Sequence, residues 1–271
     1  MYGSKKNYDR LRETGVFVWD KRQEKQLEEG LRELCGGKDT RFLQQLHKAL
    51  SEYGRVLLEW HNTFHLLGPQ NERDFVSLHL LDSISGALFL TAENLLVEKG
   101  PVQIVDVGSG LGLPGIPLAL FFSHSLNEHN EFSFFLVEPA SRRAKILRSI
   151  AAELRLSVQV CEFPVELWQQ RVSLPQPAQR IVTCRAFRPL DKKDKKDKKS
   201  RRQLLQPLER ADSNEMKTGV LLYKGPQGPQ GPEAEVQVQV QAASAKAQHI
   251  FTLPQCGHQR SLFYIDDFSA W

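Results

Sequence analysis

The sequence predicts an α/β fold in which a helical cap precedes a seven-stranded, mostly parallel sheet that ends in an antiparallel hairpin. From Arg41 to Leu67, apolar residues recur at three- and four-residue steps, which is the pattern of an amphipathic helix. After Gly100, short apolar runs alternate with helical stretches, as in a parallel sheet with helices on both faces. The last two apolar runs leave no room for a crossover helix, so they should pair antiparallel.

The cap is expected to contain two helices, the first over Arg41–Leu67 and the second over about Phe75–Leu90. The forty residues before them are charged and only weakly periodic, and Gly36-Gly37 closes that stretch. We therefore divide the chain into an N-terminal extension with the cap, residues 1–98, and a sheet domain, residues 99–271.

The sheet domain is expected to hold five strands before the hairpin, over Val102–Val107, Phe132–Val137, Ser157–Phe163, Arg180–Phe187 and Gly219–Tyr223. Its clearest helix runs over Ser141–Leu154. The hairpin strands, His249–Leu253 and Ser261–Ile265, flank a turn at Pro254–Gly257. Two segments read as inserted loops: a Lys-rich one at about 189–214 and a Gly-Pro-Gln one at 225–232, which is too short for a collagen helix.

Composition excludes several classes of protein. A hydrophobic fraction of 41% and a charged fraction of 25% are ordinary for a globular chain. The sequence has no run of about eighteen apolar residues and no apolar signal-peptide core, so we expect a cytoplasmic protein that does not enter a membrane. The four cysteines form no Cys-x-x-Cys pair, so we expect reduced thiols and no metal.

The net charge of +4 comes from one segment of the chain. Residues 191–202 carry eight basic and three acidic side chains, a net +5 that leaves the remainder at −1. Such a run is either a solvated loop or a source of non-specific attraction to phosphates.

A glycine loop, Asp106-Val-Gly108-Ser-Gly110-Leu-Gly112-Leu-Pro-Gly115, follows the first predicted strand. Glycine has no Cβ, so this backbone can turn sharply and come close to a ligand. Asp106 either orients the loop or receives the amino group of the ligand. A dinucleotide is the competing ligand, because Gly110-x-Gly112-x-x-Gly115 fits its fingerprint. Two prolines disturb that fit, and an acidic residue before Gly-x-Gly-x-Gly favours a methyl donor.

An acidic residue, Glu138, also follows the second predicted strand. A carboxylate at this point can accept both ribose hydroxyls of an adenosine ligand. This geometry suits NAD and S-adenosylmethionine alike, so Glu138 indicates a nucleoside without choosing between the two. The alternative is a solvent-facing carboxylate at the start of the next helix.

Cationic residues lie where ligands bind in open α/β sheets. Arg185 and Lys224 end the fourth and fifth predicted strands. Arg185 either contacts a phosphate, the O6 edge of a base or a donor carboxylate, or forms a structural ion pair. Arg142 and Arg143 open the helix after Glu138, where they either meet RNA phosphates or form an exposed helix face.

Other side chains are given structural roles. His79 and Asp82, three residues apart on the second cap helix, are expected to join the cap to the sheet by packing and hydrogen bonds. Trp60, Phe64 and Trp168 are expected in the core.

Four motifs together resemble the small-subunit ribosomal RNA guanine-N7 methyltransferases, the family first named glucose-inhibited division protein B. They are His79-Leu-Leu-Asp-Ser83, the glycine loop with its extension Leu113-Pro-Gly-Ile-Pro117, Arg185-Ala-Phe187 and Tyr223-Lys-Gly225. The motifs follow the family's order, and the similarity covers about residues 40–267. Departures from the family pattern include His61 in the cap helix, Pro164 and Cys184. We therefore expect an intact donor site and altered contacts with RNA.

The resemblance implies a class I S-adenosylmethionine-dependent methyltransferase with a Rossmann-like sheet. By the family pattern, Gly108 and Leu113 lie on the donor, Val165 and Glu166 lie by its adenine, and Arg185 lies near both donor and target base. The implied substrate is a guanosine in the decoding region of 16S ribosomal RNA, and the implied partner is that RNA or the small subunit. We expect a monomer.

Three alternatives stay open at this point. The first is a class I methyltransferase that acts on a small molecule or a protein. The second is an inactive nucleoside-binding regulator, which the retained site residues oppose. The third is an NAD-dependent oxidoreductase, which the terminal hairpin opposes.

Overall fold

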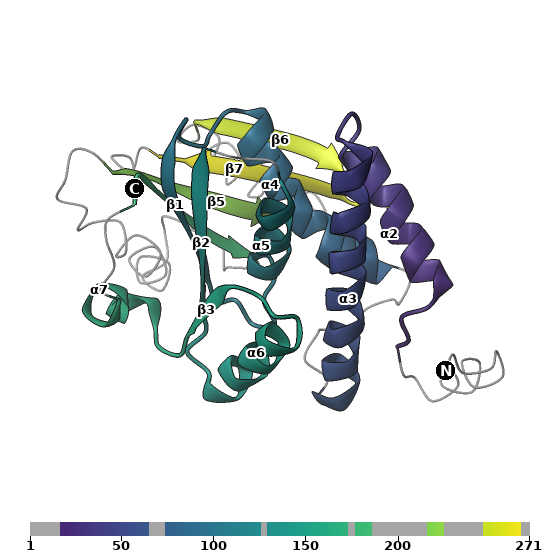
Figure 1. Cartoon of the computed structure of the whole chain (residues 1–271), viewed down its shortest axis with the longest axis horizontal. Helices are drawn as coiled ribbons and strands as arrows, with labels where there is room; N and C mark the ends of the chain where they lie inside the picture. Colours follow the sequence, from purple (N-terminus) through teal and green to yellow (C-terminus); the bar gives the residue numbers. More distant parts are fainter. Residues whose placement is uncertain are drawn as a thin grey trace, which may run out of the picture.

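The computed structural model describes residues 17–64, 74–125, 129–172, 177–185, 216–224 and 246–266. A seven-stranded sheet with the order β3-β2-β1-β4-β5-β7-β6 forms its centre (Figure 1). The strands are β1 (Gly100–Val107), β2 (Asn130–Val137), β3 (Val158–Cys161), β4 (Gln179–Arg185), β5 (Lys217–Lys224), β6 (Ala247–Thr252) and β7 (Gln259–Ile265). Strands β1 to β5 run parallel, and β7 runs antiparallel to both of its neighbours. The predicted α/β class with a terminal hairpin is confirmed.

Helices precede and connect these strands. They are α2 (Lys21–Leu34), α3 (Thr40–Phe64), η2 (Val76–Leu81), α4 (Asp82–Ala92), α5 (Gly115–His124), α6 (Ser141–Glu153), η3 (Val165–Leu167) and α7 (Trp168–Arg171). The first predicted cap helix is confirmed up to Phe64, and its last three residues lie outside the described ranges. The second is confirmed as a composite, because the six residues of η2 form a π-helix that continues directly into α4.

Helix α2 lies in the stretch whose apolar periodicity is weak. Its buried face consists of Gln23, Gln26, Leu27, Gly30 and Leu31, so only two large apolar side chains mark that face in the sequence. A capping box starts the helix: the Asp20 side chain accepts from the backbone N–H of Arg22, and the Gln23 side chain accepts from the N–H of Asp20. This cap and the low apolar content of the buried face together explain why the helix is not evident as an apolar repeat.

The sheet separates two hydrophobic cores because successive strand residues point to opposite faces. Ile104, Leu136 and Ile181 face a core shared with the helices α2 to α6. Val105 and Phe135 face the second core, which also contains Trp168. The cap is thus a helical layer packed directly on one face of the sheet, with α3 beside α5 (Figure 1).

The terminal hairpin also contacts the cap. Its turn contains Gln255 and Gly257, both with positive φ, and the Leu253 N–H donates to the His258 carbonyl at 2.8 Å. The Ser77 hydroxyl, on η2, donates to the Pro254 carbonyl at 2.7 Å. The hairpin turn is therefore bonded directly to the second cap helix.

Two further expectations concern the whole chain. None of the helices in the described ranges combines the length and the hydropathy needed to cross a membrane. The four cysteines are free thiols, as expected. The Lys-rich segment at about 189–214 and the Gly-Pro-Gln segment at 225–232 lie outside the described residues.

Candidate active site

The glycine loop leaves the carboxyl end of β1 in a conformation that requires glycine. Gly108, Gly110 and Gly112 have φ values of +73°, +58° and +95°, where side chains with a Cβ are strained. A Cβ on Gly108 would have no atom within 4 Å, whereas a Cβ on Gly112 would collide with the side chain of Ile116. Gly112 is therefore needed for packing against α5, and Gly108 borders open space.

Asp106 fixes the far end of this loop. Its Oδ2 accepts from the backbone N–H of Gly115 at 3.1 Å, where α5 begins, and its backbone carbonyl accepts from the Ser109 hydroxyl at 2.9 Å. Asp106 therefore orients the loop, which is one of its two predicted roles. Its other carboxylate oxygen, Oδ1, is buried and has no hydrogen-bond partner in the described part of the chain. Burial raises the pKa of this carboxyl to about 7.

Glu138 fixes the middle of the loop. Its Oε2 accepts from the backbone N–H of Gly110 at 3.1 Å, and its Oε1 accepts from that of Ala140 at 2.9 Å. Arg143 lies 3.2 Å from the same Oε1. Glu138 is only 1% exposed, so the alternative of a solvent-facing carboxylate is wrong. Carboxylate oxygens carry two lone pairs each, so these contacts leave acceptor capacity for a ligand.

The loops after β1, β2 and β3 form a continuous edge. The Glu138 N–H donates to the Cys161 carbonyl at 3.0 Å, which joins the ends of β2 and β3. Val165 opens η3 four residues after Cys161 and is buried, with Glu166 half-buried beside it. Leu113, at the other end of the edge, is buried where the loop enters α5. Asp106 and Glu138 are thus brought together because both bind the glycine loop, Glu138 at Gly110 and Asp106 at Gly115. Val165 and Glu166 flank this part of the site.

Arg185, the last residue of β4, is held by the cap. Its Nη1 donates to the Leu78 carbonyl at 3.1 Å and lies 3.4 Å from Asp82 Oδ2, and its Nη2 lies 2.6 Å from His79 Nδ1. A guanidinium has only donors, so His79 Nδ1 accepts and its ring is neutral. Burial and the positive charge of Arg185 both lower the pKa of His79. The predicted role of His79 and Asp82 in joining cap and sheet is confirmed.

Asp82 also binds a second guanidinium, which sequence reasoning did not identify. The Nε of Arg260, on β7, donates to Asp82 Oδ1 at 3.0 Å, so one buried carboxylate pairs with two arginines. Tyr223, the aromatic residue of Tyr223-Lys-Gly225, donates its hydroxyl to the Ser83 carbonyl at 2.8 Å. This buried cluster carries one excess positive charge beside the glycine loop.

The remaining predicted residues lie at the margins of this site. Lys224 ends β5 opposite Ser261, and its side chain lies outside the described structure. Arg142 is exposed at the start of α6, and its guanidinium lies over the Phe64 ring, 4.9 Å from the centroid. Trp168 is a core residue as expected, but Trp60 and Phe64 are half-buried at the edge of the core, so their assignment to its interior is wrong.

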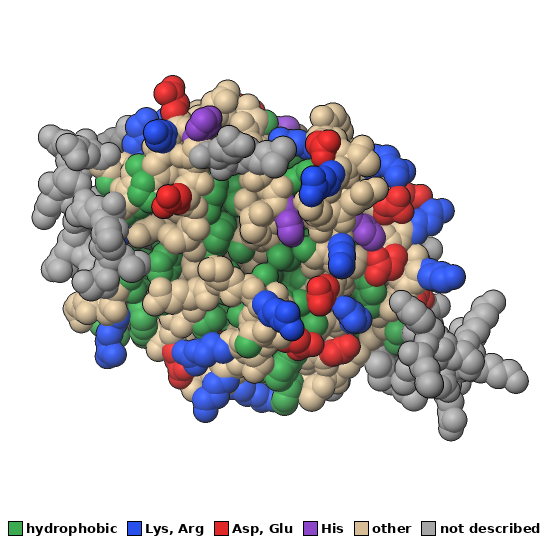
Figure 2. All heavy atoms as spheres, viewed as in Figure 1, with side chains coloured by type: hydrophobic (Ala, Val, Ile, Leu, Met, Phe, Trp, Pro, Cys, Tyr) green, Lys and Arg blue, Asp and Glu red, His purple; other side chains and the backbone are tan. Residues whose placement is uncertain are grey.

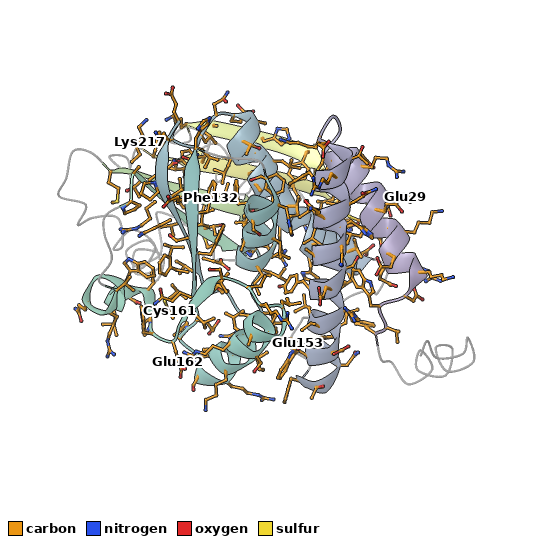
Figure 3. The ribbon with its side chains drawn as sticks, viewed as in Figure 1. Glu29, Phe132, Glu153, Cys161, Glu162 and Lys217 are labelled. Atoms are coloured by element: carbon orange, nitrogen blue, oxygen red, sulfur yellow. The ribbon has the colours of Figure 1, made fainter. Side chains whose placement is uncertain are left out.

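The described ranges contain no group of three His, Cys, Asp or Glu side chains that could hold a metal ion. Figure 3 shows Cys161, the last residue of β3, and the following Glu162 on the side of the molecule where α6 lies. The Arg148 guanidinium on α6 pairs with Glu162 at 2.6 Å, which fastens this helix to that edge.

The sheet order, the terminal hairpin and the glycine loop between two carboxylates define a class I S-adenosylmethionine-dependent methyltransferase. A family model described as rRNA small subunit methyltransferase G matches residues 46–258. The chain belongs to this family, as the motif resemblance implied.

Curated relatives agree with this assignment, and each bears the name ribosomal RNA small subunit methyltransferase G. The protein from Nitrosomonas eutropha is 31% identical over 171 residues, covering 62% of this chain and 69% of its own. The one from Treponema denticola is 32% identical over 184 residues, covering 60% and 68%. The one from Stutzerimonas stutzeri is 30% identical over 219 residues, covering 80% and 85%. These relatives do not favour the alternative of a small-molecule or protein substrate.

Proposed function

We propose that this enzyme transfers the methyl group of S-adenosylmethionine to N7 of a guanosine in the decoding region of 16S ribosomal RNA. One observation carries the proposal: a glycine loop is held at Gly110 and at Gly115 by two buried carboxylates and borders open space at Gly108. Family membership supplies the substrate class, because the relatives are named for the small-subunit ribosomal RNA.

The residues present fit the donor. The unpartnered, buried Oδ1 of Asp106 suits a cationic amino group, and the open space at Gly108 allows the donor to approach the backbone. Glu138 retains lone pairs for the ribose hydroxyls. Val165, Glu166 and Leu113 supply the walls for the adenine and its neighbourhood, as the family pattern implies. When bound, the donor supplies a methyl group on a positively charged sulfur.

The reaction requires alignment more than acid–base help. Guanine N7 carries an in-plane lone pair, so no proton has to leave before it attacks. The contribution of the protein is therefore to hold the base in line with the methyl group, which is an effect of proximity and orientation.

Arg185 is the residue that we assign to the reacting centre. The cap holds its guanidinium at the carboxyl edge of the sheet, and the cluster around Asp82 has an excess positive charge. That charge suits an anionic or electron-rich group: the donor carboxylate, a phosphate or the O6 edge of guanine. Lys224 and Arg142, on either side of this edge, are proposed to contact the RNA.

The proposed substrate also suggests where and in what form the enzyme works. We propose that the enzyme works in the cytoplasm, on the RNA or on the small subunit, as a monomer and without a metal. Sedimentation analysis would test the monomer, and methyl transfer in the presence of a chelator would test the metal.

The decisive experiment is methyl transfer from labelled S-adenosylmethionine to small subunits prepared from a strain that lacks this protein. The labelled nucleoside is identified after nuclease digestion. Label on guanine N7 supports the donor, the substrate and the position together. Donor binding without transfer to subunits contradicts the RNA substrate and leaves a methyltransferase of another specificity.

A further inference from the structure

A stack of two aromatic rings and one guanidinium lies at the end of α3. The rings of Trp60 and Phe64, one helical turn apart, are stacked with centroids 5.5 Å apart and planes at 18°. Arg142, from the start of α6, lies over the Phe64 ring at 4.9 Å. Both rings are half-buried and Arg142 is exposed, so the stack borders solvent. We call these three residues the α3–α6 stack.

The stack continues the face of α3 that contacts the glycine loop. The Tyr53 hydroxyl donates to the Leu111 carbonyl, inside that loop, at 3.0 Å. Trp60 and Phe64 follow Tyr53 by seven and eleven residues, which keeps them on the same helix face and places them about 10 and 16 Å further along the axis. Tyr53 is fully buried, whereas the two rings extend past the core.

A second path joins the stack to the donor loop. Arg143, the neighbour of Arg142 on α6, pairs with Glu138, and Glu138 accepts from Gly110. The stack therefore flanks the loop from two directions. The spacing of about 10 to 16 Å from Tyr53 along α3 suits a nucleotide that neighbours the reacting one and does not itself react.

The charge around the stack suits a phosphate backbone. Helix α6 presents four exposed basic side chains: Arg142, Arg143, Lys145 and Arg148. Figure 2 shows Lys and Arg atoms gathered at the lower edge of the molecule, where Figure 1 places α6. Stacking uses the π face of the Arg142 guanidinium and leaves its in-plane N–H donors for a phosphate oxygen.

We propose that the α3–α6 stack is a subsite for an unpaired nucleotide that flanks the target guanosine, with its base against the solvent-facing side of the stack and its phosphate on Arg142. Aromatic side chains beside cations are the usual means of binding single-stranded nucleic acid without regard to sequence. The inference rests on the proposed function, and it adds a contact that anchors the strand while the neighbouring base reacts.

Substitutions at Phe64 distinguish a role of its aromatic ring in binding RNA from a role of its apolar bulk in packing. Phe64→Leu keeps an apolar side chain but removes the ring, and we expect it to raise KM for small subunits about tenfold or more, with the Kd for S-adenosylmethionine unchanged. Phe64→Tyr keeps a ring and should retain the normal KM. Unchanged KM in folded Phe64→Leu would overturn the subsite, as would an equal loss in Phe64→Tyr.

Substitutions on α6 separate the stacked cation from its neighbours. Arg142→Gln should raise KM for subunits severalfold, whereas Arg148→Gln, which alters another exposed cation, paired with Glu162, should change it less. Equal effects of the two substitutions would mean that only general charge matters, and this result would overturn the role of Arg142.

A fluorescence measurement keeps this test independent of methyl transfer. An unstructured RNA oligonucleotide should quench the emission of Trp60 on stacking, and the quench should disappear in Trp60→Phe while the anisotropy of the labelled oligonucleotide still reports binding. Quenching without any methylation of subunits would contradict the proposed function and support the subsite. If the wild-type protein methylates subunits but the oligonucleotide quenches the emission of Trp60→Phe as strongly as that of the wild type, the subsite is wrong and the proposed function stands.

Discussion

His79 Nδ1 lies 2.6 Å from Arg185 Nη2, which ties a residue of the cap to the last residue of β4. Because the guanidinium can only donate, this contact places the His79 proton on Nε2 and keeps the ring neutral. The π-helical turn of η2 adds the Leu78 carbonyl to the same guanidinium. The cap therefore determines where the side chain of Arg185 points, and the site depends on both parts of the chain.

Arg185→Ala should abolish most methyl transfer and leave the fold intact. The fold should survive because Asp82 retains its ion pair with Arg260. We expect kcat to fall about a hundredfold or more, since the removed group helps to align the reactants. Single-turnover transfer to subunits measures the loss, and circular dichroism verifies the fold. A fully active Arg185→Ala protein would exclude Arg185 from the reacting centre.

Asp82→Asn should lower the free energy of unfolding of the protein. The substitution leaves two buried guanidinium groups without their carboxylate, and breaking a buried ion pair in this way costs about 3–5 kcal/mol. Urea denaturation measures the change in the free energy of unfolding. The control is Glu28→Gln on α2, which removes an exposed i,i+4 pair with Arg32 and should cost less than about 1 kcal/mol. Similar losses in both variants would show that the Asp82 cluster contributes little.

Gly108→Asp should abolish donor binding without unfolding the chain. A side chain at this position would enter the open space beside the loop, and a carboxylate there would repel the donor's carboxylate. The matched control is Gly37→Asp, because Gly37 has φ +84° and open space around it but lies between α2 and α3. Calorimetry with S-adenosylmethionine compares the two. Normal affinity in Gly108→Asp would contradict the loop assignment.

Donor affinity should rise with pH through about 7. Burial raises the pKa of Asp106 to about 7, above its ordinary value of 3.8, so the folded protein holds a proton there that the unfolded chain releases. The stability from the neutral carboxyl is full below about pH 4 and is lost as pH rises to about 7. A cationic amino group binds the ionised form, so affinity should gain over the upper part of this range.

Calorimetry at pH 6 and pH 8 checks this dependence. The wild-type protein should bind S-adenosylmethionine more tightly at the higher pH, and Asp106→Asn should bind it weakly at both. The pH dependence of unfolding should also flatten in Asp106→Asn between pH 4 and 7. A wild-type affinity that is constant between the two pH values would remove Asp106 from contact with the amino group.

Local patterns predicted the parts of this structure that depend on local chemistry. Strand runs and the glycine loop are visible because apolar periodicity and the absence of a Cβ act over a few residues. Arg260 was missed because its partner, Asp82, lies 178 positions away and no spacing rule connects a hairpin strand with a cap helix. The half-buried state of Trp60 and Phe64 was also missed, because an apolar stripe does not show where the core beneath it ends. The contacts of Arg185 with η2 depend on a π-helical turn that periodicity cannot distinguish from an α-helix.

The position of β7 between β5 and β6 affects how the enzyme is made. Strand β7 is the last described element to leave the ribosome, yet it supplies Arg260 to a cap helix translated far earlier. Until then β5 has an open edge, and Asp82 lacks one of its two cationic partners. A nascent chain therefore holds the glycine loop, the cap and Arg185 before Arg260 pairs with Asp82. The ion pair that joins the hairpin to the cap therefore forms only after the cap helix, the glycine loop and Arg185 have all been translated.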